Sequence, residues 1–134
     1  MQGKHLYEYA VIRLVPRVER EEFFNVGIIL FSKRAKYIKA LYKVDEDKLN
    51  LFSSELDRES LFANLHVFDK ICSGTKEGGP IAALDIPERF RWLTAVRSAS
   101  IQTSRPHPGF SDDLDRTLEI LFRELAVSYT HLTL

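Results

Sequence analysis

The chain has 134 residues, 45% of them hydrophobic and 28% charged, and its 19 basic and 19 acidic side chains balance. This length and composition indicate one globular domain with one core and exclude a disordered chain. The zero net charge gives no overall attraction to nucleic acid or to an anionic membrane surface. Either kind of partner therefore needs a local feature to support it.

The N-terminal residues and the cysteine content predict a cytoplasmic protein without membrane contact. The first residues, MQGKHLYEYAVIRL, lack the long apolar segment of a secretory signal, and the longest apolar run, VGIILF, is too short to span a bilayer. The single cysteine, Cys72, cannot form an intrachain disulfide, which suits a reducing compartment. Because Cys72 falls in an apolar helical pattern, we expect an inert, partly buried thiol there.

The first third of the chain predicts an antiparallel meander of three strands. Residues 7–15 alternate between the two faces, and Pro16 ends the run. Residues 23–32 are apolar on both sides, which is typical of a central strand covered on both faces. Residues 37–44 alternate again, with the even-numbered members on one face and the odd-numbered members on the other. We expect one face of this sheet to be packed and the other at least partly solvated.

Helical patterns follow the strands. Asp45 and Asp57 are suited to cap two helices, and Gly74 is suited to end the second. Residues 75–80, TKEGGP, indicate a turn or loop, and Pro87 fits the first position of the next helix. Strands followed by helices are typical of an α+β fold with an antiparallel sheet.

The C-terminal part of the chain combines a short polar segment with a final helix. Residues 101–104 are suited to a later strand of the sheet, and the SRPHPG segment that begins at Ser104 reads as a turn. Ser111 or Asp112 is expected to cap a helix over residues 113–126.

The last eight residues, 127–134, fit this domain poorly. The helical period of the apolar residues stops at Ala126, and VSYTHLTL resembles the translation of sequencing-adapter bases at the end of a metagenomic contig. We therefore expect a single domain over residues 1–126 followed by a non-native tail. The alternative is a genuine terminal strand.

Two separated blocks of the chain resemble the bacterial domain-of-unknown-function family 3037. The first, YAVIRLVPRVEREEFFNVGIILF, places an Arg in one strand, a charged turn after Pro, and Asn-Val-Gly in the next strand. The second, WLTAVRSASIQTSRPHPG, precedes an Asp-rich cap and LEILFRELA. The resemblance covers nearly all of residues 6–126. It implies no assigned activity, but it implies a HipA-like kinase as a partner and a toxin–antitoxin or regulatory setting.

Two of the strands carry residues that a packed sheet does not need. Arg13 lies among aromatic and branched residues, where its guanidinium needs a partner: either Glu22 or a stacked tyrosine, or an anion at the edge of a pocket. Asn25 interrupts an apolar run and must bond either to residues 16–22 or to a substrate. Gly27 indicates a close approach to the backbone by a helix or by a ligand.

The segment before the last helix holds the other candidates. Arg97 is suited either to bind an anion or to neutralise the end of the preceding helix. His107 stands between two prolines, and a stiff backbone there suits either acid–base chemistry or a turn, of which we expect the turn. Asp112 and Asp113 are expected to cap the helix, and the alternative is that one of them orients His107.

One basic run is a candidate surface for nucleic acid, and other familiar sites are missing. The run carries two interleaved tyrosines, but a solvated hairpin is the simpler interpretation, so nucleic acid is an unlikely partner. Its basic members are Lys33, Arg34, Lys36, Lys39 and Lys43. The sequence contains no Cys pair, no His-x₃-His and no Gly-rich phosphate loop, so we predict no metal site and no cofactor.

We therefore expect a regulatory or protein-interaction module. The alternative is a small-ligand binder or enzyme acting on a phosphate-bearing molecule, in which Arg13 and Arg97 hold the anion, His107 moves a proton and Asn25 orients the ligand. Whether the chain is an enzyme stays open. A pocket that collects these four residues would favour the ligand, whereas an exposed apolar patch without such a pocket would favour a protein partner.

Overall fold

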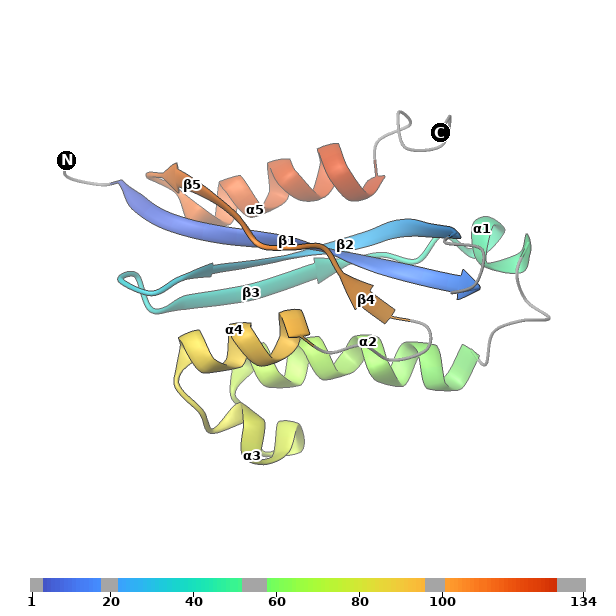
Figure 1. Ribbon diagram of the computed structural model, residues 1–134, viewed down its shortest axis with the longest axis horizontal. Helices are drawn as coiled ribbons and strands as arrows, with labels where there is room; N and C mark the ends of the chain where they lie inside the picture. The colour runs from blue at the N-terminus through green and yellow to red at the C-terminus, as the bar shows by residue number, and fades with distance from the viewer. Residues whose placement is uncertain (1–3, 18–21, 52–57, 96–100, 128–134) are drawn as a thin grey trace.

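The computed structural model describes residues 4–17, 22–51, 58–95 and 101–127 (Figure 1). Its centre is an antiparallel sheet of five strands, which confirms the predicted α+β class. The strands are β1 (His5–Arg17), β2 (Glu22–Ser32), β3 (Tyr37–Tyr42), β4 (Ile101–Thr103) and β5 (His107–Ser111). β1, β2 and β3 form the predicted meander, and β4 and β5 both pair with the side of β1 that β2 leaves open.

The described residues also form seven helical segments of different lengths. They are α1 (Glu46–Leu51), α2 (Arg58–Ser73), the 3₁₀ turn η2 (Lys76–Gly78), α3 (Gly79–Ala82), α4 (Ile86–Ala95), α5 (Leu114–Phe122) and the π-helical turn η3 (Arg123–Val127). Of the predicted tail, only Val127 falls within the described residues. No helix in the described part of the chain has both the length and the apolar character that crossing a membrane requires.

Helices cover both faces of the sheet. α5 lies on one face, and α2, α3 and α4 lie on the other (Figure 1). On the α5 face, Leu114 and Leu118 pack against Val11, Ile28 and Leu30. The opposite face holds the larger core, whose fully buried members include Ile12, Ile29, Leu49, Leu61, Leu65, Leu93 and Ile101. Because neighbouring β2 residues enter different cores, the predicted central strand with two covered faces is confirmed. The second face is more covered than we predicted, since the apolar stripe of α5 is buried there.

The predicted turn around His107 is wrong, because residues 107–111 form β5 against the first half of β1. β4 and β5 follow the same side of β1 in succession. Ile12 pairs with Thr103 and Tyr9 pairs with His107. Between these two pairs, residues 10–11 of β1 lie opposite residues 104–106, so two residues face three. That count defines a β-bulge, and an edge strand accommodates proline at a bulge. Pro106 therefore lies in the bulge and Pro108 within β5, and the two prolines do not reverse the chain.

Ser104 holds this bulge against β1. Its backbone N–H donates to the Val11 carbonyl oxygen at 2.9 Å, and its side-chain Oγ accepts from the Val11 N–H at 2.9 Å. Ser104 is buried, so these bonds form in a place where unpaired backbone groups would be costly.

Two predicted helix boundaries are confirmed. The Asp47 N–H donates to Asp45 Oδ1 at 2.9 Å at the start of α1. Gly74 follows α2 with a φ of 73°, and its N–H donates to the Lys70 carbonyl oxygen at 3.1 Å. Asp57, the predicted cap of α2, lies outside the described residues.

Two other predictions at helix ends are wrong in part. Residues 76–80, which we expected in a turn or loop, belong to η2 and α3. Asp113 caps α5, because its carboxylate accepts from the Arg116 N–H at 3.1 Å. The expectation that Asp112 and Asp113 cap this helix is therefore confirmed for Asp113, and the prediction of a cap at Ser111 or Asp112 is wrong. Ser111 is the last residue of β5, and its hydroxyl already contacts Thr117 and the Asp113 N–H.

Candidate functional site

A groove of about 1050 Å³ opens at the end of the sheet where β1 begins. Its floor is made by β1 and β5, whose register places Leu6 opposite Phe110 and Glu8 opposite Pro108. On the other side of β1, Phe31 stands opposite Glu8 and stacks on Phe90 of α4, with 4.8 Å between the ring centroids. Because directly opposed residues share a face, the groove lies on the face that α2 and α4 cover.

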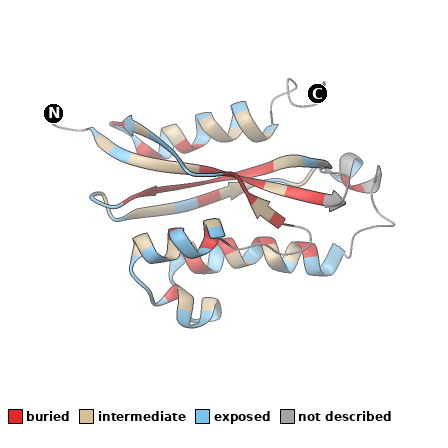
Figure 2. Ribbon diagram, in the orientation of Figure 1, coloured by how far each residue is buried: buried red, intermediate tan, exposed pale blue. Residues whose placement is uncertain are grey.

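The floor of the groove is apolar and open to solvent. Leu6 is 54% exposed and Phe110 is 69% exposed, and these two side chains form a cross-strand pair. Exposed residues at this end of β1 and along β5 contrast with the buried residues at the centre of the sheet (Figure 2). An exposed pair of large apolar side chains in a concave surface is typical of a binding site.

The rim of the groove is basic. Four cationic side chains line it, together with one carboxylate, Glu8, and with His5. The cations are Lys4, Lys33, Arg34 and Arg91. Arg91 Nη1 is 3.1 Å from Glu88 Oε1, but both side chains are exposed. An exposed ion pair contributes little free energy, so the guanidinium can leave Glu88 and bind a ligand. The net positive rim attracts an acidic ligand or partner.

Arg13 and Asn25 come together on the α5 face, away from the groove. They are directly opposed in the β1–β2 ladder. The Asn25 amide donates to the Leu125 carbonyl oxygen of η3 at 2.8 Å, so this bond goes to a helical turn and not, as we expected, to residues 16–22 or a substrate. Arg13 stacks on Phe23, with its guanidinium carbon 4.5 Å from the ring centroid, where we expected a tyrosine. The side chain of Glu22 lies outside the described residues.

Two polar atoms of this pair are buried without a hydrogen-bond partner among the described residues: Arg13 Nε and Asn25 Oδ1. One is a donor and the other an acceptor. A buried polar group in this state is costly, so the pair has hydrogen-bonding capacity that the described contacts leave unused.

Gly27 is explained by the adjacent strand, and the prediction of a helix or a ligand is wrong. A Cβ built on Gly27 would touch the Leu41 carbonyl oxygen and lie 2.7 Å from Cβ of Tyr42. Both neighbours are on β3, and Tyr42 is paired with Gly27 in the ladder. The glycine therefore lets β2 and β3 approach each other.

The remaining predicted residues do not join Arg13. His107 is exposed, and its ring packs 5.3 Å from the ring of Tyr9, its partner in the β1–β5 ladder. Tyr9 and Arg13 are four positions apart on β1, which corresponds to ~13 Å at ~3.3 Å per residue. Arg97 lies outside the described residues. None of Arg13, Asn25 and His107 lines the groove.

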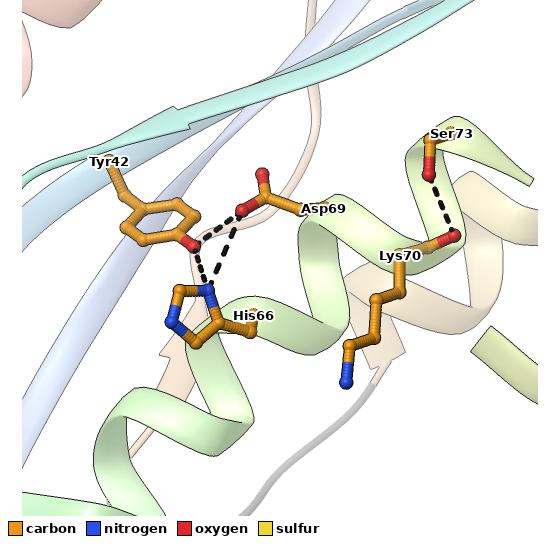
Figure 3. Close-up of polar contacts among 5 residues, drawn as sticks. All are labelled: Tyr42, His66, Asp69, Lys70 and Ser73. Carbon is orange, nitrogen blue, oxygen red and sulfur yellow. Dashed lines mark hydrogen bonds and ion pairs between the residues drawn. The ribbon is translucent and has the colours of Figure 1, made fainter. Parts of the chain in front are cut away.

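A polar cluster that the sequence analysis missed connects β3 to α2. The Tyr42 hydroxyl donates to Asp69 Oδ2 at 2.5 Å and lies 3.0 Å from His66 Nδ1 (Figure 3). Because the hydroxyl has one proton, His66 makes this contact as the donor. Burial and then the bond to Asp69 raise the pKa of the Tyr42 phenol. The spacing of His66 and Asp69 by three residues on a predicted helix was a usable signal, but their partner on β3 was not evident.

This cluster has the geometry of a structural connection. His66 and Asp69 are both exposed, and neither the groove nor a smaller hollow of about 420 Å³ beside Asp69 is lined by His66. Within the described residues, no group of three or more His, Cys, Asp or Glu side chains could hold a metal ion.

The basic run after β2 does not form a continuous track. The Tyr37 hydroxyl donates to Asp115 Oδ1 of α5 at 2.7 Å, and Lys39 lies 3.8 Å from the same atom. Tyr42 points to the opposite face, toward α2. The two tyrosines therefore cannot stack on successive bases of one strand of nucleic acid. Only Lys33 and Arg34 of this run line the groove.

Comparison with known proteins gives a family and no activity. A family model described as "Protein of unknown function (DUF3037)" matches residues 9–126, which is most of the chain. No curated protein and no solved structure matches it.

Proposed function

The chain belongs to the DUF3037 family, and we propose that it is a protein-interaction module whose groove binds an acidic segment of a partner protein that also carries large apolar side chains. The observation that supports this proposal is the exposed Leu6–Phe110 pair, framed by four cationic side chains and one carboxylate. Full burial of a Leu or Phe side chain contributes ~1.5–3 kcal/mol, and more than half of each of these two is still available.

The open, exposed floor of the groove favours a protein segment over a small molecule, whereas its volume by itself would suit either. Pockets for small ligands range over ~300–1,000 Å³ and enclose most of the ligand. The groove has about 1050 Å³ and an exposed apolar floor. Nucleic acid is less suited to it, because single strands need a row of aromatic side chains for stacking. Among the described residues lining the groove, Phe110 is the one large aromatic side chain that is largely exposed.

Binding of three fluorescent peptides, measured by anisotropy, tests the proposal. The first contains Glu and Asp around Leu and Phe, the second replaces its acidic residues by Lys, and the third replaces its Leu and Phe by Ser. We expect only the first to bind at micromolar concentration, and its affinity to fall at least tenfold for Phe110→Ser and for Arg34→Glu. Lys39→Ala is the control, since Lys39 lies on the α5 face. Equal binding of the first and third peptides would contradict the proposal.

A HipA-like kinase, which the family resemblance implies as a partner, is the first whole protein to examine. Co-purification of such a kinase should be lost with Phe110→Ser and kept with Lys39→Ala. Failure of the kinase to bind, with the acidic peptide still bound, would remove this partner and leave the groove as the binding site.

A small-ligand site at Arg13 and Asn25 is the second candidate function. It is favoured by the buried donor on Arg13 and the buried acceptor on Asn25 that have no partner among the described residues. Such a pair suits a ligand that presents an acceptor and a donor side by side, such as a protonated phosphate. NMR titration with phosphate and with nucleotides should shift the Asn25 amide signals, and unchanged signals would dismiss this candidate.

A further inference from the structure

The groove has one wall and one open side. α4 forms the wall through Pro87 and Arg91, which are one helical turn apart, and β1 with β5 forms the floor. α2 and α4 pack over the rest of this face in one layer (Figure 1). The floor beside α4 is therefore the place where a further member of the helix layer would lie.

The width and length of this floor fit a helix. Two strands spaced ~4.8 Å apart, with their side chains, span about the ~10 Å diameter of an α-helix. β5 has five residues, His107–Ser111, which extend ~17 Å at ~3.3 Å per residue. That length matches ~3 turns of helix, or ~11 residues.

An added strand is a poorer fit than a helix. β5 is an edge strand of the sheet, so a partner strand would have to bond to its free side. Pro108 lies in the middle of β5 and Pro106 in the bulge just before it, and neither has an N–H to donate. Proline on a short edge strand is a common means of preventing strand addition. The recognition must therefore use the side chains of the floor and rim.

We propose that the partner segment enters this groove as an acidic amphipathic α-helix of about three turns, placed beside α4 on the Leu6–Phe110 pair. This inference rests on the proposed function and adds the conformation and residue pattern of the partner. Apolar residues at i, i+3, i+4 and i+7 of the segment contact Leu6 and Phe110. Its acidic residues flank that stripe and meet Arg91 on one side and the cations near the start of β1 at one end. Those cations are Lys4, Lys33 and Arg34.

Three peptides of identical composition separate this inference from the proposed function. All contain the same Leu, Phe, Glu and Asp residues; the first arranges the apolar residues with helical spacing and the second alternates them with the acidic residues. The third keeps the helical order except that two central apolar residues change places with the acidic residues at the two ends. This exchange splits the apolar stripe. We expect the first to bind at least tenfold more tightly than the other two, with a gain of helical circular dichroism on binding. Phe110→Ser and, as a second variant, Leu6→Ser should each reduce that affinity at least tenfold.

The outcomes are distinct. Equal affinity for the three peptides, still sensitive to Phe110→Ser, would overturn the helix and leave the acidic-segment proposal in place. Tighter binding of the alternating peptide would also overturn it, in favour of an extended segment. No binding of any of the peptides would overturn the proposed function itself. Lys39→Ala, on the other face of the sheet, should bind all peptides as the unmodified chain does.

Discussion

Replacing Gly27 with alanine tests how closely β3 approaches β2. The new Cβ would touch the Leu41 carbonyl oxygen and lie 2.7 Å from Cβ of Tyr42, whereas unstrained carbon atoms stay ~3.5–4.0 Å apart. Both neighbours belong to the facing strand, so no side-chain rotation relieves the contact. The two strands must separate locally by about 1 Å to reach that carbon–carbon distance.

The sign of the expected effect is diagnostic. Alanine is normally favoured over glycine in the middle of a strand by ~0.5–1 kcal/mol, so an unhindered site would gain stability. Inserting a methyl group into a packed site costs ~1–3 kcal/mol. Strand separation also weakens the bond from the Lys43 N–H to the Val26 carbonyl oxygen, 2.8 Å long, and such a bond contributes ~0.5–1.5 kcal/mol. We expect Gly27→Ala to lower the free energy of unfolding by ~1–3 kcal/mol.

Urea unfolding followed by circular dichroism measures this change. Gly109→Ala is the matched control, because a Cβ there would touch Cζ and the hydroxyl oxygen of Tyr7, which are the end of a side chain and not backbone. A ring at the end of a side chain can move, so Gly109→Ala should cost less than Gly27→Ala. If Gly27→Ala is as stable as the unmodified chain or more stable, the close approach of β3 is not what requires glycine at this position.

Three further predictions concern stability and reactivity. Asn25→Leu removes a 2.8 Å bond to the carbonyl oxygen in the final helical turn and should cost ~1–3 kcal/mol in urea unfolding. Lys39 is exposed on the same face, so Lys39→Ala should change stability by less than ~0.5 kcal/mol. Equal losses for the two variants would refute a stabilising role for the Asn25 bond. Burial and the bond to Asp69 raise the pKa of the Tyr42 phenol, so the folded state keeps the phenol proton above the unfolded pKa of ~10. Stability should therefore fall as pH rises beyond that value, and it should fall less steeply in Tyr42→Phe. Identical slopes would show that the pKa of Tyr42 is not raised by folding. Burial, more than the nearby Asp69, raises the pKa of the Cys72 thiol to about 12. Iodoacetamide at pH 8 should therefore react with Cys72 at least tenfold faster after the chain is unfolded in urea. An equally fast reaction of the folded chain would show that the thiolate is accessible in the fold.

The predictions that the structure confirms rest on local periodicity. Residues 38, 40, 42 and 44 contribute to one core and residues 37 and 41 to the other, as the alternation in the sequence indicates. The apolar run of β2 identified a strand covered on both faces. These patterns are readable because burial repeats every two residues in a strand and every three to four in a helix.

The errors arose where a long-range contact overrides a local preference. The prolines on either side of His107 favour a turn, yet pairing with β1 makes residues 107–111 a strand. Ser111 and Asp112 are as suitable for a helix cap as Asp113, but Ser111 is already held in β5. A local signal cannot show which backbone groups another segment will satisfy.

At the candidate site, the difference between what local sequence patterns predict and what long-range contacts decide is larger. Sequence alone determined the fold class, the meander, the family resemblance and the residues whose chemistry is unusual for a strand, such as Arg13 and Asn25. It did not indicate the groove, because Leu6, Phe110 and Arg91 are ordinary residues in their own segments. They become a site only when β5 pairs with the start of β1 and α4 packs on the same face. Which segments become neighbours depends on the burial of the whole core, and this is why only the tertiary structure decided where a partner can bind.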